Sequence, residues 1–180
     1  MPQVERDAEC TLVVLVYRSL RWLDWCMQSV EDSKGKTRYR WLVVSNDATE
    51  EVNADPRIGL RWVNEDPQEF YINRVYRAWN AGVIESPTSW VVMLNSDMAA
   101  SDWWLDELLA VKHADRRTVP TSNLIESGRL PSGIPEHVEN HGMNPDEFRR
   151  QEFVRHADNI RTPNTTMPGR LYMPILVDRQ

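Results

Sequence analysis

The sequence predicts the α/β fold class, with a mainly parallel sheet that carries helices on both faces. Short apolar runs of strand length alternate with longer amphipathic segments through the first two-thirds of the chain. The runs are continuously apolar, as expected of parallel strands that are buried on both faces. The 180 residues form one predicted domain, 1–180, which is large enough to bury a core.

The first predicted elements are a strand at 11–16 and a helix at 19–30. The strand sequence, TLVVLV, is rich in Val, and Ser19 is a suitable helix cap. The helical spacing places four apolar residues on one face, namely Leu20, Leu23, Met27 and Val30.

Two short strands, at 41–44 and 60–63, precede the second long helix. The segment Asp66-Pro67-Gln68-Glu69 predicts the start of that helix, because Asp caps, Pro suits the first position and Glu can reach back to the cap. Ser86-Pro87 is expected to end it. The residues expected to face inward are Ile72, Val75 or Tyr76, Trp79 and Val83.

A fourth strand is predicted at 90–94, and Ser101 is expected to cap a helix that ends near Lys112-His113. Residues 120–145 carry Pro, Ser, Gly and Asn without periodicity, so we expect a long loop there. The remaining expected elements are a short helix from Asn144-Pro145-Asp146-Glu147 to about Ala157, and a strand in LYMPILVDRQ.

Composition excludes several functions. The net charge of −6 and the lack of a basic cluster argue against a nucleic-acid partner. Cys10 and Cys26 have no metal-binding spacing and are expected to be reduced, small hydrophobic residues in a cytosolic setting. No apolar run approaches the ~20 residues of a spanning helix, and the first ten residues lack the apolar core of a signal peptide. We therefore expect a cytoplasmic protein without a transmembrane segment.

Polar residues follow three of the predicted strands directly. In open α/β sheets, ligands bind at the carboxyl ends of the strands. The sequence contains neither a G-x-x-x-x-G-K-[ST] loop nor a G-x-G-x-x-G loop. Phosphate charge at this edge would therefore be neutralised by a divalent cation on a carboxylate. The polar residues at the three strand ends are Tyr17-Arg18, Asn46-Asp47 and Asn95-Ser96-Asp97.

Each of these groups also has a purely structural interpretation. Asn95 and Asp97 offer two oxygen ligands on the same side of an extended strand end, but a strand-ending turn uses the same residue types. Asp47 can accept a hydrogen bond from a base or form an Asx turn. Tyr17 can stack on a base or simply pack. Asn80-Ala81-Gly82 permits close approach of a ligand, or marks a helix that weakens near its end.

The four histidines are not expected to form a set of metal ligands. His137 and His141 have i, i+4 spacing, but they lie in a segment predicted to be a loop.

Four segments in order resemble the family 2 glycosyltransferases, which have the GT-A fold. That family has a strand followed by P-x-Y-N, a strand followed by V-D-D-G-S, then A-R-N-x-G, and a strand that ends in D-x-D or N-x-D with W-L shortly after. The corresponding segments, between Thr11 and Leu109, are LVYRSLRWLDWCMQSV, VVSNDATEE, RAWNAGVIES and VVMLNSDMAASDWWLDELL.

The resemblance implies a site for a nucleoside-diphosphate sugar that holds Mn²⁺ or Mg²⁺. Tyr17 would line the base pocket, Asp47 would contact the base, and Asp97 with Asn95 would bind the metal. Three positions depart from the family pattern, namely Arg18, Asn46 and Trp79. The full implied set of nucleotide-sugar-binding residues is Val16, Tyr17, Arg18, Asn46, Asp47, Asn80, Asn95, Ser96 and Asp97.

The expected activity is metal-dependent transfer of the sugar to a hydroxyl of a glycan, lipid or protein acceptor. Residues 11–112 would form the nucleotide-sugar-binding half and 113–180 a partial, truncated acceptor-side region. The catalytic base of the family would lie beyond Gln180, and Glu152 and Asp158 lack the family context for that role.

Two alternatives remain at this point. One is a non-catalytic or truncated nucleotide-sugar-binding module. The other is a sugar-phosphate nucleotidyltransferase. Tyr17-Arg18-Ser19-Leu20 stands where that enzyme class carries a loop rich in Gly and Arg, which counts against the second alternative.

Overall fold

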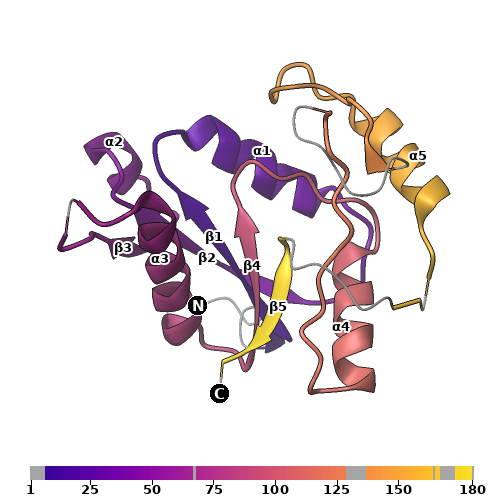
Figure 1. Ribbon diagram of the computed structural model, residues 1–180, viewed down its shortest axis with the longest axis horizontal. Helices are drawn as coiled ribbons and strands as arrows, with labels where there is room; N and C mark the ends of the chain where they lie inside the picture. The colour runs from indigo at the N-terminus through magenta and orange to yellow at the C-terminus, as the bar shows by residue number, and fades with distance from the viewer. Residues whose placement is uncertain (1–6, 67, 129–136, 164, 167–172, 180) are drawn as a thin grey trace.

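The computed structural model describes residues 7–66, 68–128, 137–163, 165–166 and 173–179. Its centre is a five-stranded sheet in the order β3-β2-β1-β4-β5 (Figure 1). Strands β1 to β4 run parallel to one another, and β5 runs antiparallel to β4. The strands are β1 (Cys10–Val16), β2 (Tyr39–Asn46), β3 (Ile58–Trp62), β4 (Trp90–Asn95) and β5 (Ile175–Asp178).

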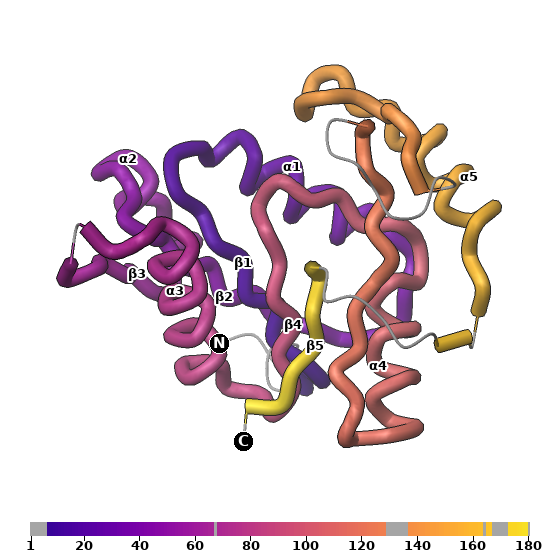
Figure 2. Tube along the Cα trace, in the orientation of Figure 1, coloured from indigo at the N-terminus to yellow at the C-terminus, as the bar shows by residue number. Residues whose placement is uncertain are grey.

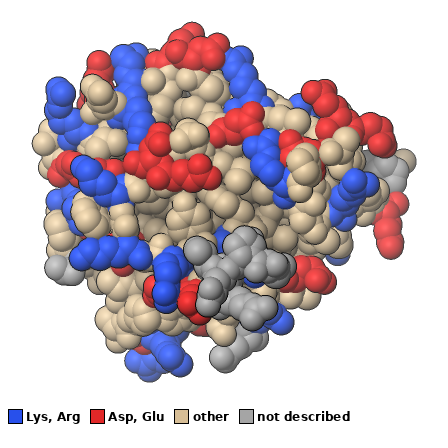
Figure 3. Space-filling view, turned by 180° about the vertical axis from the view of Figure 1, so that it is seen from behind, with Lys and Arg blue, Asp and Glu red and all other residues tan. Residues whose placement is uncertain are grey.

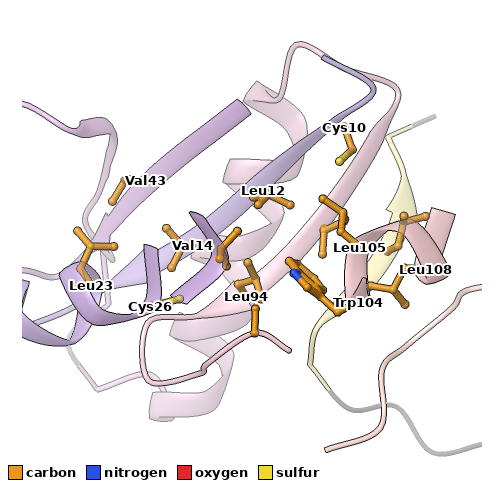
Figure 4. Packing of buried hydrophobic residues seen from close by; sticks show 14 of the residues in the cluster. Cys10, Leu12, Val14, Leu23, Cys26, Val43, Leu94, Trp104, Leu105 and Leu108 are labelled. Carbon is orange, nitrogen blue, oxygen red and sulfur yellow. The ribbon is translucent and has the colours of Figure 1, made fainter. Parts of the chain in front are cut away.

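Helices cover both faces of this sheet, which confirms the predicted fold class. Helices α1 (Leu20–Glu31) and α4 (Trp104–Ala114) pack on one face, where Leu12 and Val14 of β1 meet Leu23, Trp104 and Leu105 (Figure 4). Helix α3 (Tyr71–Glu85) packs on the other face, where Val13 and Leu15 meet Ala78 and Trp79. Successive β1 side chains thus alternate between two apolar cores, as the pleat requires.

Helix α1 begins as the sequence predicts, because Ser19 Oγ accepts a hydrogen bond from the Trp22 N–H at 3.5 Å. Helix α3 does not begin at Asp66. It starts at Tyr71, and Asp66 instead accepts hydrogen bonds from the Gln68 and Glu69 N–H groups in a turn. Pro67 lies outside the described residues. Val75, Trp79 and Val83 face inward as predicted, whereas Ile72 and Tyr76 are exposed.

Helix α4 starts at Trp104 rather than after Ser101. Trp103 has φ 65°, and its N–H donates to the Lys34 carbonyl at 2.6 Å, so the chain turns before the helix can begin. Helix α5 (Arg150–Ile160) also starts later than predicted, because Asn144 Oδ1 accepts from the Asp146 and Glu147 N–H groups in a separate turn. A short helix, α2 (Glu50–Asn53), follows the Thr49 cap.

Helix α5 and the segment before it lie at the end of the molecule farthest from α3 (Figure 1). Figure 2 shows α5 and the segment before it beyond α1 and α4. The described part of 120–145 contains no named helix or strand, as predicted, although it makes two isolated β-bridges. Trp25 of α1 packs edge-on against Phe148 at 5.0 Å, and Glu107 of α4 pairs with Arg161 at 2.5 Å. These contacts place the segment around α5 against α1 and α4.

Charges of both signs are intermixed on the face in Figure 3, in keeping with the net charge of −6. Within the described ranges, no helix is both long and apolar enough to cross a membrane.

Candidate functional site

A cleft of about 2410 Å³ opens at the carboxyl ends of β1, β2 and β4. This volume exceeds the roughly 300–1,000 Å³ that is typical of a small-molecule site, so the cleft has room for more than one ligand. Seven of the nine predicted site residues line it, whereas Asp47 and Asn80 do not. The seven are Val16, Tyr17, Arg18, Asn46, Asn95, Ser96 and Asp97.

The end of β1 presents an aromatic ring and a cation together. The side chain of Tyr17 is 39% exposed, and the Arg18 guanidinium lies 4.4 Å from the centre of its ring. This is a cation–π contact. One face of the ring is therefore covered, and a planar ligand would meet the Arg18 guanidinium as well as Tyr17.

Asn46 and Asp47, at the end of β2, have different surroundings. Asn46 lines the cleft and is only 6% exposed, and its Oδ1 has no hydrogen-bond partner among the described residues. Asp47 has φ 47°. Its carboxylate accepts from the Asn64 N–H at 2.9 Å, from Asn64 Nδ2 at 2.7 Å and from Arg74 Nη1 at 3.3 Å. The free acceptor at this strand end is thus Asn46, while Asp47 joins β2 to the segments that follow β3.

The end of β4 carries the predicted oxygen ligands. β4 ends at Asn95, and Ser96 and Asp97 form a turn instead of continuing the strand, as the structural interpretation of this segment predicts. Asp97 is exposed to the cleft and makes no ion pair or hydrogen bond within the described part of the chain. One carboxylate and a neighbouring amide are a donor set that suits a hard divalent cation completed by phosphate oxygens.

The Cys26 thiol lies close to this turn. Its Sγ donates to the Asn95 carbonyl at 3.4 Å. Burial raises the pKa of Cys26 to about 12, and the nearby Asp97 charge adds to the increase, against a lowering by the Met98 backbone. Burial likewise raises the pKa of Cys10 to about 12. Both cysteines are free and buried, in agreement with the sequence prediction of reduced thiols.

Asn80 and Gly82 lie away from the cleft. Asn80 is exposed in the third turn of α3. Gly82 is buried where α3 crosses the sheet, and a Cβ there would lie 2.6 Å from Val13 Cγ1 and 3.0 Å from Val44 Cγ2. The small residue therefore permits close packing of the helix on the sheet rather than the approach of a ligand.

The wall of the cleft beside α1 is aromatic. Trp22 and Trp25 line it and meet edge-on at 5.5 Å, and Phe148 extends the wall from the C-terminal segment. Both tryptophans are half-buried. Their spacing of three residues is also that of one helix face, so the sequence pattern alone does not separate core packing from a cleft wall.

The carboxylates of the C-terminal segment differ in their access to the cleft. Asp158 is exposed and lines it. Glu152 is exposed and pairs with Arg149 at 2.6 Å.

No family model and no curated protein matches the sequence. Solved structures do match it. A fragment of S. aureus TarS, residues 1–349, is 15% identical with a TM-score of 0.50, covering 71% of this chain and 38% of the fragment. The same fragment in complex with UDP-GlcNAc gives 16% identity and a TM-score of 0.49 over 69% of this chain and 37% of the fragment.

A third match is the mannosyltransferase PcManGT from Pyrobaculum calidifontis in complex with GDP-Man and Mn²⁺. It is 15% identical with a TM-score of 0.41, covering 64% of this chain and 35% of PcManGT. At these identities the TarS match establishes the fold. The chain spans less than two-fifths of the length of the protein in each of these three structures.

Proposed function

We propose that the cleft binds a nucleoside-diphosphate sugar together with a divalent cation, and that the chain is a glycosyltransferase that passes the sugar to an acceptor hydroxyl. The observation that carries the proposal is the meeting of three strand ends in one cleft. They bring together, at the same edge of the sheet, a carboxylate (Asp97) and a buried amide oxygen (Asn46) that have no partner in the described part of the chain, and an exposed aromatic ring (Tyr17).

Asp97 and Asn95 are the residues that would hold the cation. Asp97 is accessible and has no partner to displace among the described residues, and Asn95 adds a neutral oxygen. A cation held there supplies positive charge to the diphosphate as it leaves. The net charge of −6 gives a second reason for a cation, since an anionic donor would otherwise meet an acidic protein.

The two residues at the end of β2 have different roles in base recognition. The Asn46 Oδ1 atom accepts a hydrogen bond from a base N–H, which gives this buried oxygen the partner that it lacks. Asp47 acts as a positioning residue, because its carboxylate is already engaged by Asn64 and Arg74. Tyr17 packs on the base, with Arg18 on or near its ring.

The aromatic wall and residues 113–180 form the acceptor side. Trp22 and Trp25 offer apolar ring faces and edges of the kind that cover sugar rings, and the cleft is large enough for donor and acceptor together. Of Glu152 and Asp158, Asp158 is the carboxylate to test as a base for the acceptor hydroxyl, since it lines the cleft and Glu152 is paired elsewhere. Glu136, another carboxylate to be considered as this base, lies outside the described residues.

The donor class in this proposal is also the class of ligand in the TarS structure with UDP-GlcNAc. At 16% identity that ligand is a property of TarS. The donor sugar and base of this chain therefore have to be measured.

The test incubates the chain with UDP-, GDP- and dTDP-sugars, Mn²⁺ and a panel of acceptors, following nucleotide release and glycoside formation separately. Glycoside formation that is lost in Asp97→Asn and reduced in Asp158→Asn supports the transferase. Saturable binding of a sugar nucleotide with neither transfer nor hydrolysis would show a binding module instead. No binding of any donor at millimolar concentration overturns the proposal.

A further inference from the structure

Three side chains from the C-terminal segment converge at a second place in the cleft. The ligand atoms of Glu139, His141 and His156 all lie within 4.8 Å of one another. His156 Nδ1 is 2.7 Å from Glu139 Oε2 and 3.2 Å from His141 Nε2. Glu139 and His141 also line the cleft, so the cluster is accessible from it.

The geometry points to a transition-metal site at Glu139, His141 and His156, with Zn²⁺ as the ion that this donor set suits best. Two imidazoles and one carboxylate are a common protein ligand set for Zn²⁺ and related first-row cations, and the fourth position is filled by water or a substrate atom. Asn95 and Asp97 offer only oxygen, and oxygen favours Mg²⁺ or Mn²⁺ instead. The two places in the cleft thus select different ions.

The short contacts within the cluster cannot both be good hydrogen bonds. Both short contacts use the same atom, His156 Nδ1, which carries at most one proton. That proton cannot be aligned with the Glu139 carboxylate and with His141 Nε2 at the same time. A cation between the three atoms accepts a lone pair from each of them. The charge of Glu139 then faces a metal rather than a shared N–H.

The three ligand atoms need to move little to bind one Zn²⁺ ion. Two ligands of a tetrahedral Zn²⁺ at about 2.0–2.1 Å lie roughly 3.4 Å apart. The two imidazole nitrogens are already 3.2 Å apart. The Glu139 side chain, which is 55% exposed, has the freedom to widen its 2.7 Å contact with His156.

His141 is held in place for this role by its surroundings. It is only 4% exposed, its ring packs edge-on against Phe153 at 5.7 Å, and its carbonyl accepts from the Arg149 N–H at 2.7 Å. Gly142 follows with φ 123°, and a Cβ there would meet the Glu147 carbonyl oxygen at 2.5 Å. Burial lowers the pKa of His141 from its ordinary value.

The other two ligands come from separate backbone supports. The Glu139 N–H donates to the Glu126 carbonyl at 2.9 Å, beside the bridge between Glu126 and Val138. His156 projects from α5, one turn after the buried Phe153. A bound metal would therefore tie α5 to 137–149. The sequence does not reveal this cluster, because 15 residues separate the two histidines.

The test is a titration of the tag-free chain with Co²⁺ and with Zn²⁺ after treatment with a chelator. We expect one equivalent of Co²⁺ to give the intense visible absorption of a four-coordinate ion, and Zn²⁺ to displace it. His156→Ala and Glu139→Gln should each weaken Zn²⁺ binding at least tenfold. Glu139→Gln keeps the shape of an exposed side chain, so it remains informative if the histidine variant fails to fold.

Two control variants separate this site from the rest of the protein. His113→Gln removes an exposed histidine outside the cluster, and Asp97→Asn removes the carboxylate at the end of β4; both should bind Zn²⁺ as the wild type does. Zn²⁺ should also raise the melting temperature of the wild type and of both controls, but not of His156→Ala. Weak octahedral Co²⁺ spectra, or Zn²⁺ affinity unchanged in both ligand variants, would overturn the site. The outcome of this metal titration does not depend on the transferase proposal, so a chain that transfers no sugar could still have the Zn²⁺ site.

Discussion

The Cys26 thiol of α1 donates a hydrogen bond to the carbonyl of Asn95, the last residue of β4, at 3.4 Å. This contact fixes the strand end immediately before the turn that carries Asp97. Cys26 is also among the residues buried in the apolar core between α1 and the sheet (Figure 4). A buried helix residue thus sets the position of the turn at which we expect the cation to bind.

We predict that neither cysteine reacts in the folded protein. Burial raises the pKa values of Cys10 and Cys26 to about 12, so at pH 8 almost no thiolate is present. Labelling with iodoacetamide at pH 8, followed by mass spectrometry, should give unmodified native protein and two labels after unfolding. Rapid single labelling of the native protein would show that one of these residues is more accessible than the structure has it.

Gly82→Ala should destabilise the protein although Ala favours helices. The added Cβ would lie 2.6 Å from Val13 and 3.0 Å from Val44, both on the sheet. Overpacking typically costs about 1–3 kcal/mol, and the gain in helix propensity offsets at most about 1 kcal/mol. Urea denaturation measures the difference. Ile84→Ala, on the exposed side of the same helix, is the matched control and should change little. An alanine variant as stable as the wild type would contradict this packing.

Asp106 should contribute stability that is lost in acid. Its carboxylate accepts hydrogen bonds from the Lys36 N–H, the Thr37 N–H and Thr37 Oγ1. Partial burial opposes ionisation, but these hydrogen bonds outweigh it and hold the pKa of Asp106 below its ordinary value. A carboxyl with a depressed folded-state pKa stabilises the fold above its unfolded pKa, about 3.9, and loses this contribution as the pH falls through the folded value.

Asp106→Asn should therefore lower the free energy of unfolding by about 1–3 kcal/mol at pH 7 and by much less at pH 2–3. Denaturant titrations at both pH values make the comparison, with Glu51→Gln as an exposed control in α2. An equal loss at both pH values would mean that the charge of Asp106 has no part in the effect.

Asn46→Ala should weaken binding of a nucleoside diphosphate but not of pyrophosphate. The variant leaves a base N–H without its acceptor in a buried place, which costs about 1–3 kcal/mol, or roughly 5- to 150-fold in affinity. Calorimetric titration with both ligands gives the comparison, and the melting temperature checks that the variant is folded. Equal losses for the two ligands would assign Asn46 to the phosphates or to the fold.

The sheet and its helices could be predicted from the sequence because their signals are local. Runs such as TLVVLV have the length and composition of buried strands, and Ser19 forms the cap that its position predicts. A capping motif in the sequence predicts the first residue of a helix less well than an apolar run predicts a strand. Asp66 and Asn144 both form turns before their helices begin, since an Asx turn satisfies the same N–H groups that a cap would.

The candidate site could be predicted in part for a topological reason. Residues directly after parallel strands share one sheet edge whatever the rest of the chain does, which is why seven of the nine predicted residues line the cleft. Asn80 is predicted from a motif in the middle of a helix rather than at a strand end, and it lies on the exposed side of α3, away from the cleft. The far wall depends on contacts such as Trp25 with Phe148, which join residues over 100 positions apart and leave no local pattern.

The most direct test of the account is calorimetric titration of the chain with UDP, GDP, dTDP and CDP, each with Mn²⁺ and with EDTA, for the wild type and Asp97→Asn. Asp97 is exposed at a strand end, so the variant should fold normally. The account predicts that one diphosphate binds at least tenfold more tightly with Mn²⁺ than with EDTA, and that Asp97→Asn abolishes the difference. Binding in the variant that still responds fully to saturating Mn²⁺ would contradict the assignment of the cation to Asp97.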